Sequence, residues 1–433
     1  MMSGQKAFRG AVFHCLADPG ERGDAAAAEC FDDGLLVIAN GRVEALGPAE
    51  TLLAGLPSGT EVVDYRNRII VPGLIDTHVH FAQLDIIASH GAQLLDWLES
   101  YAYPAEAACA DAVHARALAE AFLDELLRNG TTTALVFATV HPHSVEAIFE
   151  AAAARNMRLI AGKVLMDRLC RPDLADDAES GYAESRRLIE KWHGRDRLGY
   201  AITPRFALTS SDRQLQLAGK LAGECPEVWV HTHLAENKDE IAAIAELFPG
   251  SGGYLDVYAS HGLLRQRSVF AHCVHLESVE AQLLGREGGA VAFCPTSNLF
   301  LGSGLFDLRA MASAGIRTGL ATDIGAGTSP SLLRTMGEAY KVLQLQGQVL
   351  PVTRAFYLAT LGAARALDLD DCIGNFAAGK EADFVVLDPG ASALMARRAD
   401  ASVSIEELLF AMMFLGDERH VAATYVQGVP AAV

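Results

Sequence analysis

The chain has 433 residues, of which 51% are hydrophobic and 21% are charged, a composition typical of a folded globular protein. Its 35 basic and 54 acidic side chains give a net charge of 35 − 54 = −19, which excludes the usual nucleic-acid-binding and membrane-surface-binding proteins. No apolar run reaches the length of a signal peptide or a membrane span, and the eight cysteines contain no CxxC pair. We therefore expect a cytoplasmic protein with reduced thiols and no membrane partner.

The first part of the chain predicts short β-strands. Residues 34–47 form two apolar runs on either side of Asn40-Gly41, a dipeptide typical of the type I′ turn of a hairpin. Further strand patterns occur near both ends of the chain, at 61–71, 383–388 and 422–427. We expect a small β-sandwich domain built from both chain termini, residues 1–70 and 381–433.

The central part, residues 71–380, alternates short apolar runs with helical patterns. The runs are 74–80, 133–140, 159–166, 198–206, 228–234, 269–274, 290–295 and 318–323. Apolar residues follow at helical spacing between several of them, as at 111–128 and 179–193. Eight strands alternating with helices indicate an α/β fold, a distorted (β/α)8 TIM-type barrel. In such barrels the catalytic residues lie at the C-terminal ends of the strands.

Histidines and one aspartate stand at the ends of four of these runs. They are His78 and His80 in the first run, His231 and His233 in the fifth, His272 in the sixth and Asp323 in the eighth. Residues i and i+2 of a strand point to the same face, so each His-X-His pair can direct two imidazoles toward one point. Imidazoles together with one carboxylate suit Zn²⁺ or Fe²⁺. The pattern therefore predicts a metal centre.

Other polar residues near these runs have different expected places. His141 and His143 flank a proline that breaks the strand, so we expect them in a loop near the pocket and not among the ligands. His231 is expected to be structural, because its neighbour His233 is the one followed by an acid, Glu236. A carboxylate three residues after a ligand can exchange protons with a water at the metal without binding the metal itself.

These motifs resemble the amidohydrolase superfamily and, within it, the mononuclear metal-dependent aminohydrolases. The resemblance is carried by PGLIDTHVHFAQ, HTHLAEN, the strand that ends in His272, and ATDIGAG. Four further segments narrow it to the members that act on guanine: LLDWLESYAYPAE, AGKVLMD, TPRFALT and CPTSNLFLGSG. It covers roughly residues 70–380 and the flanking β segments. The resemblance implies hydrolytic deamination of guanine, in purine catabolism, by a homodimeric enzyme.

The resemblance also assigns roles to matching residues. It implies that His78, His80, His233 and Asp323 hold one metal ion, zinc or, alternatively, iron. Glu236 matches the proton shuttle, and His272 matches the histidine beside the reacting water, on which Asp323 also acts. Binuclear relatives use a carboxylated lysine on the fourth strand, and LGYAITPRF contains no lysine, which favours a single metal. Lys163, on the third strand, is expected to be structural, with a role in the pocket left open.

Three further residues match the purine-binding positions, and their chemistry suits guanine. The guanidinium fork of Arg205 can pair with the O6 and N7 acceptors of guanine, as arginine does in DNA recognition. Gln83 offers a donor and an acceptor to the O6/N1–H edge, and Phe206 can stack on the ring. Trp97 and Tyr101 either cap the pocket or belong to the packing of a helix, and the sequence leaves both possibilities open.

Other functions compete with this interpretation. An aminohydrolase of the same architecture could act on 8-oxoguanine, a pterin or a triazine. A barrel without catalytic activity could serve as an inactive scaffold or as a purine-binding module, although the ligand residues and Glu236 are all present. The HxE and PCxxC signatures of the zinc deaminases that act on flipped bases are absent, so this would be a different fold performing similar chemistry.

Overall fold

The computed structural model describes residues 4–91 and 93–432, and the chain divides into two compact units. One unit comprises Met1–Ile75, Asp124–Thr133 and Ser331–Val433, and the other comprises Asp76–Leu123 and Ala134–Pro330. Residues 331–380, which the sequence groups with the barrel, belong to the unit that contains the chain termini. A reason is visible in the packing, because α13 (Leu332–Leu345) packs against α17 (Ile405–Leu415).

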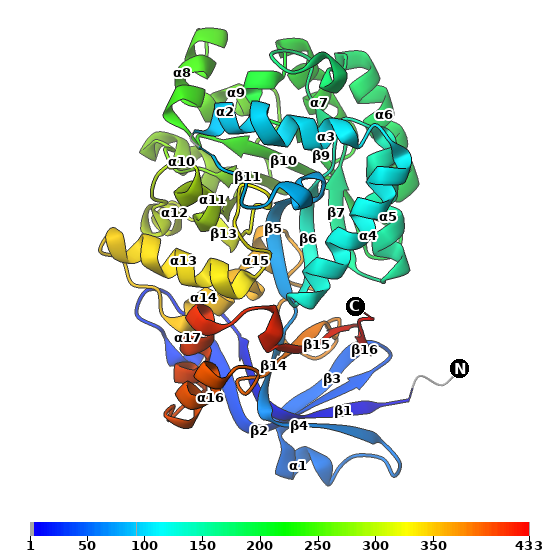
Figure 1. Cartoon of the computed structure of the whole chain (residues 1–433), viewed down its shortest axis with the longest axis vertical. Coiled ribbons are helices and arrows are strands. Elements are labelled where there is room, and N and C mark those ends of the chain that lie inside the picture. Colours follow the sequence, from blue (N-terminus) through cyan, green and yellow to red (C-terminus); the bar gives the residue numbers. More distant parts are fainter. Residues whose placement is uncertain (1–3, 92, 433) are drawn as a thin grey trace. The chain divides into compact units, whose positions relative to one another are not determined.

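The terminal unit contains one mixed sheet of seven strands, in the order β16-β15-β14-β4-β1-β2-β3 (Figure 1). Its strands are β1 (Lys6–Cys15), β2 (Ala28–Ala39), β3 (Arg42–Pro48), β4 (Glu61–Pro72), β14 (Phe384–Leu387), β15 (Val421–Val426) and β16 (Val429–Pro430). β1 and β4 run parallel, and the other neighbours are antiparallel. The prediction that both chain ends build one β unit is confirmed, with the strands paired along a single continuous sheet.

Local sequence explains how this sheet forms. Asn40 and Gly41 have φ values of 53° and 73°, the left-handed conformations that a type I′ turn requires, and they join β2 to β3 as predicted. Phe8, Phe384 and Tyr425 form the centre of its core, with the rings of Phe384 and Tyr425 stacked 4.3 Å apart. The unit also contains η1 (Ala25–Ala27), α1 (Ala49–Leu53), α14 (Val352–Ala359), α15 (Leu361–Ala366), α16 (Ala393–Asp400) and η6 (Glu418–His420).

The second sheet forms a nearly closed barrel, in the order β13-β12-β11-β10-β9-β7-β6-β5, which confirms the predicted TIM-type fold. Its strands are β5 (Leu74–His80), β6 (Thr131–Phe137), β7 (Arg158–Gly162), β8 (Val164–Leu165), β9 (Leu198–Pro204), β10 (Trp229–Leu234), β11 (Ser268–His272), β12 (Ala290–Phe293) and β13 (Arg317–Leu320). The short strand β8 pairs with β9 beside this path. The Thr77 hydroxyl donates to the Leu320 carbonyl at 2.9 Å, which links the first strand to the last.

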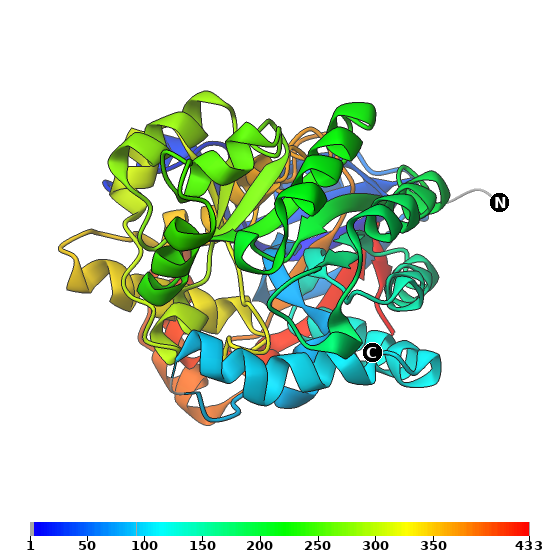
Figure 2. The ribbon, with the colours of Figure 1, turned by 90° about the horizontal axis from the view of Figure 1, so that it is seen from above.

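Helices lie around these strands when the molecule is seen from above (Figure 2). They are η2 (Phe81–Ile86), α2 (Leu94–Trp97), η3 (Leu98–Ala102), α3 (Tyr103–Ala108), α4 (Ala112–Arg128), α5 (Pro142–Ala154), η4 (Pro172–Leu174), α6 (Ala178–Trp192), η5 (Ala207–Thr209), α7 (Asp212–Glu224), α8 (Lys238–Leu247), α9 (Tyr254–Ser260), α10 (Ser278–Arg286), α11 (Pro295–Phe300) and α12 (Leu308–Ser313). Each barrel strand is buried almost throughout, as expected for parallel strands covered by helices. None of the helices within the described residues combines the length and apolar character needed to cross a bilayer.

Candidate active site

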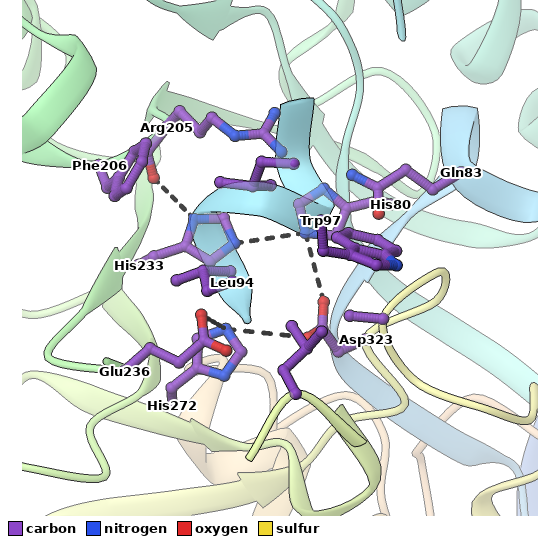
Figure 3. A pocket seen from close by; sticks show the side chains of 13 residues that line it. His80, Gln83, Leu94, Trp97, Arg205, Phe206, His233, Glu236, His272 and Asp323 are labelled. Carbon is purple, nitrogen blue, oxygen red and sulfur yellow. Dashed lines mark hydrogen bonds and ion pairs between the residues drawn. The ribbon is translucent and has the colours of Figure 1, made fainter. Parts of the chain in front are cut away.

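A pocket opens at the C-terminal ends of the barrel strands, where the sequence predicts the site (Figure 3). It is lined by His80, Gln83, Leu94, Trp97, Leu98, Arg205, Phe206, His233, Glu236, His272, Leu301, Asp323 and Ala326. The predicted residues come from separate strands: His80 ends β5, Arg205 follows β9, and His272 ends β11. The closure of the barrel therefore brings together side chains that are far apart in sequence, such as Asp323 and His80, which are 243 positions apart.

Four potential ligand atoms converge at one end of this pocket. The Nε2 atom of His80 lies 3.2 Å from Nε2 of His78 and 3.3 Å from Nε2 of His233. Asp323 Oδ1 lies 3.2 Å from His78 Nε2 and 3.4 Å from His80 Nε2. A tetrahedral ion bound by ligands at about 2.0–2.1 Å separates those ligands by about 3.3 Å. His80 Nε2 thus lies at about this ligand-to-ligand distance from each of the other three atoms.

Contacts behind the histidines direct their Nε2 atoms toward this point. His233 Nδ1 lies 2.7 Å from the carbonyl oxygen of Arg205, so Nδ1 carries the proton and donates it, and Nε2 presents a lone pair. His78 Nδ1 lies 2.8 Å from Nε2 of His231. His231 is completely buried and lies behind the cluster, where it orients His78. The same outer hydrogen bonds orient the histidine ligands of metal sites in general.

The protonation of these groups suits cation binding. Burial lowers the pKa of His80 to about 4, and it lowers the pKa of His233 well below its usual value, with a further contribution from His78. Burial acts to raise the pKa of the Asp323 carboxyl, but attraction and hydrogen bonding by His78 and His80 outweigh it and lower that pKa. Neutral imidazoles and an ionised carboxylate are the forms that coordinate a metal.

Two of the site residues have a strained backbone. His272 has a φ of 71° and Asp323 a φ of 50°, the left-handed region that side chains other than glycine rarely occupy. Such conformations cost on the order of 1–3 kcal/mol each and occur mainly where function requires a particular side-chain direction. His272 is the last residue of β11, and Asp323 lies three positions beyond Leu320, the last residue of β13. The strain indicates that these directions are imposed by the surrounding fold.

Glu236 faces the cluster from the loop after β10. It is 2% exposed, and its Oε2 lies 3.5 Å from Nε2 of His272. The Ser303 hydroxyl donates to Glu236 Oε1 at 3.0 Å, and Asn298 Oδ1 lies 2.9 Å from His272 Nδ1. Burial, reinforced by the Asp323 charge, raises the pKa of Glu236 to about 8. The carboxyl is therefore protonated at neutral pH and can donate a proton.

A capping box fixes the loop that carries Glu236. The backbone N–H groups of Glu236 and Asn237 donate to Glu240 Oε2 at 3.0 and 3.1 Å, and the Tyr254 hydroxyl donates to Oε1 at 2.6 Å. Asn237 is the N-cap of α8. Sequence reasoning missed this arrangement, although the spacing of Asn237 and Glu240 before an apolar run is a recognisable helix-start signal.

Arg205 and Gln83 line the other end of the pocket, and both contact a residue that the sequence did not single out, Glu106, which is not among the lining residues. Arg205 Nη1 donates to both carboxylate oxygens of Glu106, at 2.7 and 2.6 Å. Gln83 Nε2 donates to Glu106 Oε1 at 2.8 Å, and its Oε1 accepts from the backbone N–H of Gly325 at 3.1 Å. Gly325 permits this approach, because a Cβ there would lie 2.6 Å from the backbone oxygen of Gln83. Glu106 and Tyr103 are three positions apart and both are buried on α3. This helical spacing, which places an acidic residue on the same face as an aromatic one, is the sequence feature that could have indicated Glu106.

The aromatic residues divide between pocket and periphery. Phe206 lines the pocket, with its ring centroid 6.3 Å from that of His233. Trp97 also lines the pocket and is 2% exposed, whereas Tyr101 is not among the lining residues and packs against Trp97 at 6.5 Å. Of the two possibilities that the sequence left open, the geometry places Trp97 at the pocket and Tyr101 behind it.

Two other predicted groups stay outside the ligand cluster. His141 is the N-cap residue of α5, and His143 Nε2 hydrogen-bonds the Cys109 carbonyl at 2.7 Å. Lys163 lies between β7 and β8 and forms ion pairs with Asp176 and, at 3.5 Å, with Glu184. These contacts agree with the expectation that none of the three is a ligand.

Known proteins share the whole architecture. The amidohydrolase family matches residues 69–430. Guanine deaminase from Escherichia coli (strain K12) is 52% identical over 434 residues, which cover 99% of this chain and 98% of the relative. The solved structure of E. coli guanine deaminase superposes with a TM-score of 0.96 and covers 99% of both chains. The crystal structure of guanine deaminase from C. acetobutylicum with bound guanine in its active site has 28% identity and a TM-score of 0.90, covering 99% of this chain and 100% of that one.

Proposed function

The chain belongs to the amidohydrolase family, and we propose that it hydrolyses guanine to xanthine and ammonia. The observation that carries this proposal is one buried pocket that combines a metal-ligand cluster with an arginine and a glutamine. A guanidinium and an amide offer the donors and the acceptor that complement O6, N7 and N1–H of guanine. The relatives at 52% and 28% identity, both guanine deaminases, support the same substrate.

One metal ion would be held by His78, His80, His233 and Asp323, and we propose Zn²⁺, with Fe²⁺ as the alternative. His80 Nε2 lies 3.2–3.4 Å from the other three ligand atoms, close to the distance between two ligands of a tetrahedral ion, and this supports a single ion. When bound, the ion supplies Lewis acidity, which makes water nucleophilic at neutral pH.

The chain's own carboxylates and His272 would move the protons. Asp323, whose Oδ2 lies 3.8 Å from His272 Nε2, takes a proton from the attacking water. Oxygen then bonds to C2 of guanine, and Glu236 gives its proton to N3 as charge develops there. The hydroxyl proton of the adduct then passes through Glu236 to the amino group, the C2–N bond breaks, ammonia leaves and the C2 carbonyl of xanthine forms. The proton on Asp323 passes back to Glu236, which restores both carboxyl groups. The raised pKa of Glu236, about 8, supports its role as the acid of the first transfer.

Substrate orientation would fall to Gln83, Arg205 and Phe206. Gln83 retains one amide hydrogen beyond the one it gives to Glu106, and Arg205 retains donors beyond Nη1. Phe206 supplies an aromatic surface on the same side of the pocket as Arg205 (Figure 3). Fixing C2 of the purine toward the ligand cluster in this way converts a bimolecular encounter into an oriented reaction.

The direct test is the change in ultraviolet absorbance of guanine on addition of protein whose metal content is determined on the same sample. We expect conversion to xanthine with one metal ion per chain. Conversion of 8-oxoguanine, a pterin or a triazine in preference to guanine would instead identify another aminohydrolase. Protein that holds metal and converts none of these would contradict the enzyme proposal and favour a purine-binding or scaffold role.

We propose further that the enzyme works as a cytoplasmic homodimer in purine catabolism. All eight cysteines are free thiols, which supports a reducing compartment. Phe414, 38% exposed, packs with Phe410 and Tyr340 on α13 and α17, and this apolar surface would contribute to a dimer contact. Sedimentation analysis of the wild-type protein and of Phe414→Asp tests the assembly, because an unchanged dimer in the variant would exclude this surface.

A further inference from the structure

A single buried carboxylate connects the two polar side chains of the purine end. Glu106 is 1% exposed and accepts two hydrogen bonds from Arg205 Nη1 and one from Gln83 Nε2. It comes from α3, whereas Arg205 follows β9 and Gln83 lies in η2. The residue is not among those that line the pocket, so it acts on a ligand only through Arg205 and Gln83.

Glu106 compensates the charge of Arg205. Arg205 is 2% exposed, and the Glu106 carboxylate lies 2.6 Å from its Nη1, so the two charges neutralise each other in a region of weak screening. Tyr103, on the same helix as Glu106, places its ring 5.2 Å from the guanidinium carbon of Arg205. The other acidic groups of the pocket are Asp323, which is ionised, and Glu236, which is protonated and uncharged at neutral pH. The purine end of the pocket therefore offers a ligand no uncompensated positive side chain among the described residues.

Glu106 also determines how Gln83 faces the purine. A carboxylate only accepts hydrogen bonds, so the Gln83 amide must turn its NH₂ group toward Glu106. The backbone N–H of Gly325 only donates, and it meets Oε1 of the same amide. The two neighbours together exclude the flipped amide, and one N–H and one lone pair of Gln83 remain for a ligand.

We propose that Glu106 is a specificity-determining positioning residue, which orients Arg205 and Gln83 and cancels the Arg205 charge so that the pocket binds neutral purines in preference to anionic ones. This inference rests on the proposed deamination of guanine. In xanthine both ring N–H groups of the six-membered ring flank a carbonyl at C2, so xanthine loses a proton more readily than guanine. A purine end without excess positive charge thus binds the neutral substrate and releases the more acidic product.

The test compares two competitive inhibitors that share O6 and N7, xanthine and hypoxanthine, in a slightly alkaline buffer. There most of the xanthine is anionic and most of the hypoxanthine is neutral. Glu106→Gln removes the charge and keeps the shape, and we expect it to lower the ratio of the inhibition constants, xanthine over hypoxanthine, by about tenfold or more. Glu106→Asp keeps the charge, and Glu99→Gln removes an exposed charge on the neighbouring η3, so both should leave the ratio near the wild-type value.

An unchanged ratio in a Glu106→Gln variant that still converts guanine would overturn the inference. Circular dichroism and metal content would show whether this variant is folded. A second variant gives an independent outcome, because Arg205→Met leaves the Glu106 charge without its partner and should raise the ratio about tenfold. An unchanged ratio there, measured by calorimetric binding, also contradicts the inference. Absence of guanine conversion by the wild-type protein would instead refute the proposed function, and binding of the two inhibitors would still decide the role of Glu106.

Discussion

The two ends of the pocket, the histidine cluster and the Arg205 guanidinium with its partners, differ in how their charges are balanced. At the histidine end, His80 Nε2 lies 3.2–3.4 Å from three other potential ligand atoms, which belong to His78, His233 and Asp323. At the guanidinium end, the charge of Arg205 is already matched by Glu106 at 2.6 Å. The first arrangement is complementary to a cation, and the second is complementary to a neutral molecule with hydrogen-bonding edges.

The two ends thus contribute differently: the histidine end would bind the metal ion, and the guanidinium end would bind the substrate. The histidine end would be stabilised by the proposed ion, since clustered lone pairs repel one another until a cation binds them. The guanidinium end is preorganised by the protein itself, so its donors stand ready without rearrangement. We therefore expect changes at the histidine end to abolish chemistry, and changes at the guanidinium end to alter substrate affinity and selectivity.

Removal of the metal should have the largest effect. Dialysis against a chelator is expected to lower guanine conversion by about 10⁴-fold or more, because water then lacks the Lewis acid that activates it. Thermal unfolding should also shift to lower temperature, since a ligand that binds only the folded state stabilises it. Metal analysis and the absorbance assay check this, with Zn²⁺ and Fe²⁺ added back separately. Full activity in metal-free protein would contradict the proposal that the histidine end holds a metal ion needed for the reaction.

Loss of the proton carrier should come next. Glu236→Gln is expected to lower kcat/KM by about 10²- to 10⁴-fold while the metal stays bound, because the amide keeps the shape but has no acidic proton. The matched control is Glu246→Gln, an exposed glutamate on α8, which should keep wild-type activity. Steady-state kinetics with metal analysis measures both. If Glu236→Gln lost its metal, Glu236 would belong to the ligand cluster instead.

Weakening the guanidinium end should have a smaller effect and a different signature. Arg205→Lys is expected to lower kcat/KM for guanine by about 10- to 100-fold, because an ammonium cannot bind Glu106 and the purine with the fixed fork of arginine. Metal content should not change. His233 Nδ1 donates a hydrogen bond to the Arg205 carbonyl, so the backbone connects the two ends. A loss of metal in this variant would therefore show that the two ends are not independent.

The smallest expected effect concerns pH. Glu236, with a pKa raised to about 8, is protonated below that pH, so kcat/KM should fall as the pH rises through 8. The Ser303 hydroxyl stabilises the ionised form by donating to it, so Ser303→Ala should raise this pKa and move the alkaline limb to higher pH by about half a unit. A shift to lower pH would contradict the assignment. Profiles of kcat/KM for both proteins provide the measurement.

The sequence by itself predicted the barrel and the places of its polar residues. Continuous apolar runs followed by helical patterns indicate strands buried on both faces, and local periodicity is enough to recognise them. His78 and His80 point together because they are two positions apart in β5, which is a property of any strand. The Asn40-Gly41 turn is equally local, because it depends only on which residues tolerate a positive φ.

Only the tertiary structure revealed the partners that tune these residues. Glu106 and Arg205 are 99 positions apart, and Ser303 and Glu236 are 67 positions apart, so no local pattern joins them. Whether a carboxylate is ionised, protonated or paired depends on burial and on neighbours from other elements. The grouping of residues 331–380 with the terminal sheet has the same origin, since it follows from packing between distant helices. Periodicity thus determined where the chemistry lies, and long-range packing decided the charge and direction of each group.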